Sequence, residues 1–211
     1  MEDKFEYERK YLEKGYKYIA GVDEVGRGPL AGPVVCCAVI MPLDEKLLIE
    51  GIDDSKKIPE KKRERFAEII KERAICYSIF EVSQEEIDEI NILNAVKKCM
   101  TGAVNALTQK PDITLVDGID THLPINAEYV IKGDAKSYTI GCASIVAKVY
   151  RDNLMKKYAE EFPEYGFEKH KGYGTQVHIL AIKEKGPCRL HRKTFIKNFS
   201  AEVARKEQPN T

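Results

Sequence analysis

The sequence contains no tryptophan and carries no net charge, because 34 lysines and arginines balance 34 aspartates and glutamates among 211 residues. Its six cysteines form no C-x-x-C pair, and no histidine stands at zinc-ligand spacing, which argues against a zinc site or a disulfide framework. No apolar run approaches the ~20 residues that cross a bilayer, and the N-terminus is too charged for a signal peptide. We therefore expect a soluble, cytoplasmic protein with reduced, buried thiols and no membrane partner.

The neutral total hides an uneven distribution of charge. Residues 132–197 hold eleven lysines and three arginines against two aspartates and five glutamates, a net charge of +7, so the remainder carries −7. A basic C-terminal part on a neutral chain predicts a local anionic partner, and phosphate backbones are the commonest one. The alternative is a scattered set of solvated lysines.

The most informative stretch covers residues 18–39, where two apolar runs bounded by glycine and proline predict a strand, a tight loop and a second strand. Asp23 and Glu24 follow the first run. Side chains alternate along a strand, so at least one carboxylate is expected on the covered side, where it needs a partner or a metal. The turn Gly26-Arg27-Gly28 lets backbone N–H groups approach an anion beside a cation. These residues alone leave two interpretations open, a metal-dependent phosphate enzyme or a charged hairpin end with solvated acids.

Helical and strand patterns alternate along the rest of the chain. We predict a short helix within residues 1–17 and a helix that begins at Gln84, after the Ser83 capping box. Further helices are predicted over 60–73, 92–107, 139–161 and 176–185. Strands are predicted over 74–82, 113–118 and 129–132. The simplest account is one α/β domain over residues 1–211, of which about 175–211 form a helical C-terminal extension.

Three of the predicted strands end in acids, namely Asp23 with Glu24, then Asp117, then Asp134. Ligands collect outside strand ends in α/β sheets, so these carboxylates are expected to converge. Carboxylates at such short distances repel one another unless cations lie among them. A set of oxygen donors without histidine or cysteine favours a hard ion such as Mg²⁺. Taken singly, Asp117 could be a turn residue before Gly118, and Asp134 could cap a helix.

Seven motifs in register resemble the type 2 ribonuclease H (RNase HII) family over residues 17–199. They are GVDEVGRGPLAGP at 21–33, DSK at 54–56, VDG at 116–118, KGDAKS at 132–137, ASIVAK at 143–148 with Arg151 and Asp152, GYGT at 172–175 and HRKTF at 191–195. Two places depart from the family's usual residues, Ile119 and Cys188-Arg189, and both put only details of substrate contact in doubt.

The resemblance implies an RNase H-like mixed five-stranded sheet flanked by helices, with a helical C-terminal extension. It also implies hydrolysis of the RNA strand of RNA–DNA hybrids and cutting 5′ of single ribonucleotides embedded in duplex DNA. The products would carry 5′-phosphate and 3′-hydroxyl ends, and two Mg²⁺ or Mn²⁺ ions would take part.

The resemblance also assigns roles to individual residues. The catalytic and metal-binding set would be Asp23, Glu24, Asp117 and Asp134. Substrate contacts would come from Gly26, Arg27 and Gly28 at the 2′-hydroxyl, Tyr173 on the sugar of the following deoxynucleotide, Lys56, Ser144 and Lys148 near phosphates, and Arg192 and Lys193 on the duplex backbone. From the residues alone, Tyr173 could instead be a loop aromatic packed on its own glycines, and the basic side chains could be solvated.

Three rival functions share some of these features: a silent hybrid-binding module, an exonuclease and a small-molecule phosphatase. The complete acid set argues against the module, and the basic C-terminal part would be idle in a phosphatase. An end-blocked substrate distinguishes the exonuclease. We expect a monomer, and residues 202–211 show no clear sliding-clamp peptide.

Overall fold

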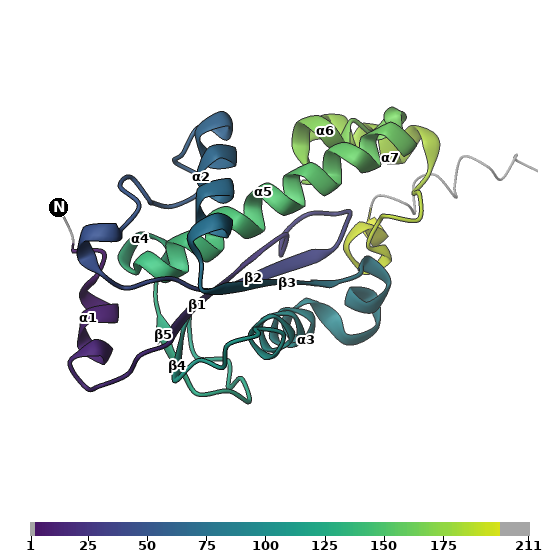
Figure 1. The fold of residues 1–211 in the computed structure, drawn as a ribbon. Coiled ribbons are helices and arrows are strands. Elements are labelled where there is room, and N and C mark those ends of the chain that lie inside the picture. Colours follow the sequence, from purple (N-terminus) through teal and green to yellow (C-terminus); the bar gives the residue numbers. More distant parts are fainter. Residues whose placement is uncertain (1–2, 199–211) are drawn as a thin grey trace, which may run out of the picture.

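The structure is a computed structural model that describes residues 3–198 (Figure 1). Its strands are β1 (Ile19–Val25), β2 (Val34–Ile40), β3 (Cys76–Val82), β4 (Ile113–Asp117) and β5 (Ala127–Val130). Its α-helices are α1 (Glu6–Leu12), α2 (Glu60–Arg73), α3 (Gln84–Asn105), α4 (Gly133–Lys136), α5 (Tyr138–Glu161), α6 (Phe167–His170) and α7 (Gln176–Lys185), and two 3₁₀ turns are η1 (Glu45–Leu47) and η2 (Pro163–Tyr165).

The five strands form one mixed sheet in the order β3-β2-β1-β4-β5, which confirms the predicted fold class. β1, β2 and β3 pair antiparallel, whereas β1, β4 and β5 run parallel. Parallel strands end at the same edge of a sheet, so the carboxyl ends of β1 and β4 bring their acids to one edge, and α4 begins there just after β5.

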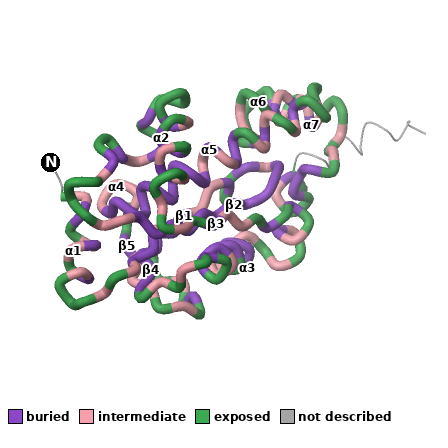
Figure 2. Tube along the Cα trace, in the orientation of Figure 1, coloured by how far each residue is buried: buried purple, intermediate pink, exposed green. Residues whose placement is uncertain are grey.

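Helices cover both faces of the sheet, with α5 on one face and α3 on the other (Figure 1). Every residue of β2 is buried for this reason (Figure 2). Alternation along β2 sends Cys37 to the core under α5 and Cys36 to the core over α3. All six cysteines are free, and four of them are buried.

Strand β1 and helix α5 approach each other unusually closely at Gly21. A Cβ built on Gly21 would lie 2.2 Å from the carbonyl carbon of Thr139 and 2.4 Å from the amide nitrogen of Ile140. The first turn of α5 therefore lies directly on the backbone of β1. Glycine is required because there is no room for any side chain.

The C-terminal part forms a separate apolar cluster at the far end of α5 (Figure 1). Phe167 and Tyr165 stack at 5.5 Å, and Met155 of α5 packs with them and with Leu190. Residues 193–198 are helical, as predicted for the extension, and residues 199–211, including the segment without a clamp peptide, lie outside the described residues.

Most predicted elements are observed, and the differences have local causes. The prediction for α2 is confirmed at both ends, and Ser83 Oγ accepts a hydrogen bond from Glu86 N at 3.3 Å as the capping box requires. The two helices predicted after Ser83 merge into α3, which breaks at Asn91 (φ 66°), where the side chain caps the second half through Asn94 N.

The strand predicted over 129–132 is displaced toward the N-terminus. β5 ends at Val130, and Lys132 (φ 58°) turns the chain into α4, so Asp134 lies in the first turn of a short helix. Asp134 is not the cap that the alternative suggested, because Lys132 occupies the N-cap position and no side chain caps α4. Asp134 still reaches the acidic edge of the sheet.

No helix within residues 3–198 is both long enough and apolar enough to span a bilayer.

Candidate active site

A cavity of about 420 Å³ opens where β1 and β4 end. Its walls come from two strand ends, the loop before α2, helices α2, α4 and α5, and the loop before α7. The lining residues are Asp23, Glu24, Val25, Ser55, Lys56, Arg63, Asp117, Asp134, Ser144, Lys148 and Tyr173. All four predicted carboxylates therefore share one cavity, together with four of the predicted substrate contacts.

Asp23 and Glu24 lie deep in this cavity. Asp23 is 6% exposed, and burial, followed by the charges of Glu24 and Asp117, raises its pKa well above the usual range, although a hydrogen bond from Ser144 opposes the shift. Burial and the charge of Asp117 raise the pKa of Glu24 to about 7, against the opposing charge of Arg27. Both groups therefore hold protons more tightly than ordinary carboxyls do.

Asp117 and Asp134 are shifted in the same direction. Burial raises the pKa of Asp117, even though Gly133 N donates a 2.6 Å hydrogen bond to its Oδ1. Burial and then the charges of Asp117 and Asp54 raise the pKa of Asp134. Asp54 was not anticipated as a neighbour of these acids. Four carboxyls with raised pKa values form a negative site that a cation would relieve.

The donors in this cavity fit a hard divalent cation. Among residues 3–198, no three His, Cys, Asp or Glu side chains lie close enough together to hold an ion by themselves. Mg²⁺ keeps several waters and binds through one or two carboxylates plus substrate phosphate, so it does not need a closed cage of protein ligands. Asp23, Glu24, Asp117 and Asp134 are the side chains that would share such ions.

Lys56 stands at the mouth of the cavity as a counter-charge. Burial lowers its pKa, but the charges of Asp54, Asp134 and Asp23 outweigh this effect, and the pKa is raised. The exposed ammonium group therefore stays protonated and available to a phosphate.

Arg63 is a lining residue that sequence reasoning missed. Its Nη1 donates to Ser55 O at 2.7 Å and to Ile58 O at 3.0 Å, and Nη2 donates to Asp152 at 3.4 Å. It thus holds the loop that carries Lys56. A sequence signal existed, because Arg63 precedes Phe66 and Ile70 by three and seven positions, which places a cation on the apolar face of α2.

Ser144 and Lys148 both have partners inside the protein. Ser144 Oγ lies 3.0 Å from Ser55 Oγ and hydrogen-bonds Asp23. Lys148 Nζ donates to Asp152 Oδ1 at 2.7 Å, and burial lowers the pKa of Lys148. The solvated-lysine alternative is therefore wrong for Lys148.

The Gly26–Gly28 turn and Tyr173 lie side by side at the cavity. The Tyr173 ring is 41% exposed, and its Cε1 would be 3.9 Å from a Cβ placed on Gly28. Arg27 projects into solvent and reaches Glu24 at only 3.9 Å. The two groups predicted to read the sugars are thus neighbours.

The structure corrects the prediction for Arg192 and qualifies the basic C-terminal part. Arg192 has no exposed surface, so it is not available to touch a duplex backbone, and that prediction is wrong. Arg151 is fully buried as well. Lys193, by contrast, is exposed. Part of the positive charge counted in the sequence therefore lies inside the protein.

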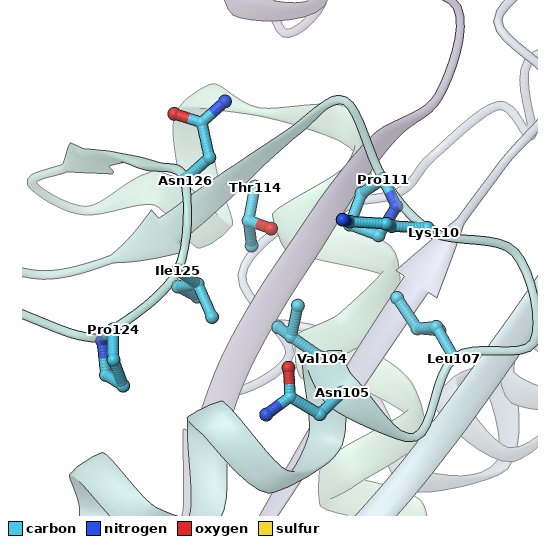
Figure 3. Close-up of a pocket in the computed structure, with 9 residues that line it drawn as sticks. All are labelled: Val104, Asn105, Leu107, Lys110, Pro111, Thr114, Pro124, Ile125 and Asn126. Atoms are coloured by element: carbon cyan, nitrogen blue, oxygen red, sulfur yellow. The ribbon is translucent and has the colours of Figure 1, made fainter.

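A second cavity of about 500 Å³ lies between the end of α3 and the start of β4 (Figure 3). It contains no carboxylate. Its lining residues are Val104, Asn105, Leu107, Lys110, Pro111, Thr114, Pro124, Ile125 and Asn126. The larger cavity thus offers no carboxylate to bind a metal ion, and the acidic one is the candidate site.

Two buried histidines lie behind the Tyr173 loop and predict a pH-dependent stability. Burial lowers the pKa of His178 and of His191 from 6.5 to about 4; His170, Tyr165 and Cys188 pack against them. Below pH 6.5 the unfolded chain binds protons that the folded chain refuses. The contribution of the two neutral histidines to the free energy of unfolding is therefore fully present above pH 6.5, and it is lost as the pH falls toward 4. The loss at pH 5 is on the order of 2 kcal/mol per histidine.

Urea unfolding of the wild type and of His178→Asn at pH 7 and pH 5 tests this expectation. The variant should lose less stability on acidification, because one of the two histidines is gone. The raised pKa of Glu24 acts in the opposite direction but is common to both proteins. Equal losses in the two proteins would contradict the assignment.

Comparisons with known proteins match this chain to one family. The ribonuclease HII family model matches residues 20–198. The chain is 55% identical to ribonuclease HII of Caldicellulosiruptor saccharolyticus, covering 94% of this chain and 96% of that protein. It is 53% identical to ribonuclease HII of Caldicellulosiruptor bescii, with the same coverage.

Solved structures show the same fold. Ribonuclease H2 of Pyrococcus horikoshii superposes with a TM-score of 0.75 at 27% identity, covering 91% of this chain and all of that one. RNase HII of Archaeoglobus fulgidus, solved in complex with PCNA, gives 0.72 at 27% identity over 91% of this chain and 98% of that one. Bst-RNase HIII in complex with Mn²⁺ gives 0.70 at 16% identity, covering 89% of this chain and 70% of that one, and shows likeness of fold alone.

Proposed function

Because the chain belongs to the ribonuclease HII family, and is therefore a ribonuclease H that acts on RNA–DNA hybrids, we propose that it also cuts 5′ of single ribonucleotides embedded in duplex DNA. Cleavage would leave 5′-phosphate and 3′-hydroxyl ends. We further propose that the enzyme works as a cytoplasmic monomer with two Mg²⁺ or Mn²⁺ ions.

The observation that carries this proposal is the convergence of Asp23, Glu24, Asp117 and Asp134 on one cavity in which burial and mutual repulsion raise their pKa values. When bound there, divalent cations would activate a water for attack on phosphorus and stabilise the departing 3′ oxygen. The four side chains would hold the cations, and the charge of the cations would favour their ionised forms.

The remaining lining residues support substrate binding. Lys56 is the open cation beside the acids and would meet the phosphate, while Lys148 lies deeper and is held by Asp152. Ser144 orients Asp23 through its hydroxyl group. Lys193, on the surface, would contact the duplex backbone.

The substrate's sugars would meet the rim formed by the Gly26–Gly28 turn and Tyr173. Backbone N–H groups of the turn would bind the 2′-hydroxyl, the group that distinguishes RNA from DNA. The exposed Tyr173 ring next to the turn would stack on the sugar of the following deoxynucleotide.

An end-blocked DNA duplex with one ribonucleotide, incubated with Mg²⁺, Mn²⁺ or a chelator, tests the proposal. We expect a cut on the 5′ side of the ribonucleotide with either metal and none with the chelator. The blocked ends exclude an exonuclease. Cleavage of a long RNA–DNA hybrid without any cut at the single ribonucleotide would refute the embedded-ribonucleotide activity while leaving the family assignment intact.

A further inference from the structure

The Gly26–Gly28 turn and the Tyr173 loop are far apart in sequence but are joined by backbone contacts. Leu30 N donates to Gly172 O at 2.8 Å. Gly172 has φ +84°, and a Cβ there would lie 2.5 Å from Ala31 O, so the two loops touch where no side chain intervenes. Their spacing is therefore a built feature of the fold.

Arg192 holds the first of these loops. All four hydrogen bonds of its guanidinium group go to backbone carbonyls: Nε and Nη2 to Gly32 O at 3.0 and 2.8 Å, Nη1 to Arg27 O at 3.0 Å, and Nη2 to Gly26 O at 2.5 Å. A buried guanidinium thus lies beneath the turn and draws its carbonyls inward.

The inward carbonyls fix where the amide groups point. The peptide bonds here are trans, so an N–H lies opposite the carbonyl of its own peptide unit. With the carbonyls of Gly26 and Arg27 directed at Arg192, the N–H groups of Arg27 and Gly28 face away from it. Neither N–H has a hydrogen-bond partner within residues 3–198. Arg192 therefore presents two free donors on the outer side of the turn.

His191, the preceding residue, is linked to the second loop. His178 Nδ1 lies 2.9 Å from Tyr173 O, His178 Nε2 lies 3.0 Å from His191 Nε2, and Cys188 N donates to His191 Nδ1 at 3.0 Å. A carbonyl only accepts, so His178 carries its proton on Nδ1 and accepts at Nε2. His191 must then carry its proton on Nε2. One pair of neutral tautomers satisfies these three bonds, while Cys188 O, 3.3 Å from His191 Nδ1, accepts its hydrogen bond from His191 N.

The segment that carries both residues is itself pinned to the first loop. Arg192 N donates to Leu30 O at 2.8 Å, Gly32 N donates to Leu190 O at 2.8 Å, and Ala31 pairs with His191 as an isolated bridge. Of two consecutive side chains in one short segment, Arg192 thus binds the first loop, and His191 contacts His178, which binds the second.

We propose that Arg192 and His178 are positioning residues that set the spacing between the Gly26–Gly28 turn and Tyr173. Arg192 binds the carbonyls of the turn, and His178 binds the carbonyl of Tyr173. This spacing determines the preference of the enzyme for a ribonucleotide followed by a deoxyribonucleotide. The inference rests on the proposed junction-reading function. The residues act on selectivity and not on the chemical step, because none of them lines the acidic cavity.

Matched variants separate this role from a general structural one. His178→Asn keeps an amide donor near the Nδ1 position and the bond to Tyr173 O, whereas His178→Gln moves the amide toward Nε2 and loses that bond. Arg192→Lys keeps the charge but replaces the planar guanidinium group, with its several N–H donors, by one compact ammonium group. Arg65→Lys and His122→Gln, both at exposed positions outside the cavity, are the controls.

The measurement is the ratio of kcat/KM for the single-ribonucleotide duplex to that for an all-RNA strand on DNA, with Mg²⁺. We expect His178→Gln and Arg192→Lys to lower this ratio at least about tenfold, because small misplacements of a positioned group cost large factors in rate. His178→Asn and the controls should keep the ratio of the wild type. Nitrogen-15 NMR of the wild type should show His178 protonated at Nδ1 and His191 at Nε2.

The outcomes are distinguishable. An unchanged ratio in folded His178→Gln and Arg192→Lys overturns the positioning role alone, and so does an equal loss in His178→Asn and His178→Gln. If Arg192→Lys does not fold, the two His178 variants decide. A wild type that cuts hybrids but not single ribonucleotides overturns the proposed function and this inference together.

Discussion

Asp134→Asn is expected to lower kcat by about a thousandfold, because loss of a metal-binding carboxylate removes several kcal/mol of transition-state stabilisation and each ~1.4 kcal/mol is worth tenfold in rate. The affinity for an RNA–DNA hybrid should change little, since Asp134 is an acid and the phosphates are met by cations such as Lys56. Single-turnover cleavage and hybrid binding, measured side by side, check both parts.

The free energy of unfolding of the Asp134→Asn variant is a second, independent test. Burial, followed by the charges of Asp117 and Asp54, raises the pKa of Asp134, so the folded protein contains a desolvation cost and a repulsion that an amide would reduce. Asp134→Asn should therefore be at least as stable as the wild type, as expected when a functional group is held at a cost to the fold.

Asp44→Asn is the matched control, because Asp44 is an exposed helix cap that accepts a hydrogen bond from Lys46 N. An asparagine side chain accepts the same bond. Activity should not change in that variant. Full activity in Asp134→Asn would remove Asp134 from the metal-binding set.

Gly21→Ala is expected to have the largest effect on stability, about 4 kcal/mol or more, which is the range reached by severe core overpacking. The added methyl would lie 2.2–2.4 Å from backbone atoms of Thr139 and Ile140, and backbone in the first turn of a helix does not move aside as a flexible side chain would. Strand β1 and helix α5 would have to separate, and Asp23 would lose its place opposite Ser144.

Gly15→Ala provides the comparison, because Gly15 has φ +86° and open space around it. The loss of stability in Gly15→Ala should be limited to backbone strain of about 1–2 kcal/mol. Urea unfolding of the two variants measures the difference. A Gly21→Ala protein as stable as Gly15→Ala would show that β1 and α5 do not approach as closely as described.

Local patterns in the sequence predicted most of the elements because those elements depend on local forces. The helices over 60–73 and 176–185 and the Ser83 capping box each depend on neighbours within a few residues, and each was confirmed. The acids at strand ends could also be placed at one edge of a sheet, because parallel strands end together. Where turn geometry decided the matter, as at Lys132 before Asp134, the predicted boundary was displaced.

The roles of buried cations could not be predicted from the same patterns. Arginine and lysine are mostly exposed, so a basic segment is expected at the surface. Arg151 and Arg192 are buried instead because the Gly26–Pro33 loop turns its carbonyls inward and satisfies them, Arg151 through Pro33 O and Ala31 O. Those carbonyls lie more than a hundred positions away in the chain.

The sequence by itself thus predicted the fold class, the convergence of the four carboxylates and the family, since these follow from residue type, spacing and motif order. The tertiary structure alone decided which charges are available to substrate and which are structural. It also decided that Arg192 lies under the Gly26–Gly28 turn, while its neighbour His191 contacts His178 behind the Tyr173 loop. The physical reason is that the cost of burying a charge or a histidine depends on distant hydrogen-bond partners, and only the folded chain brings those partners together.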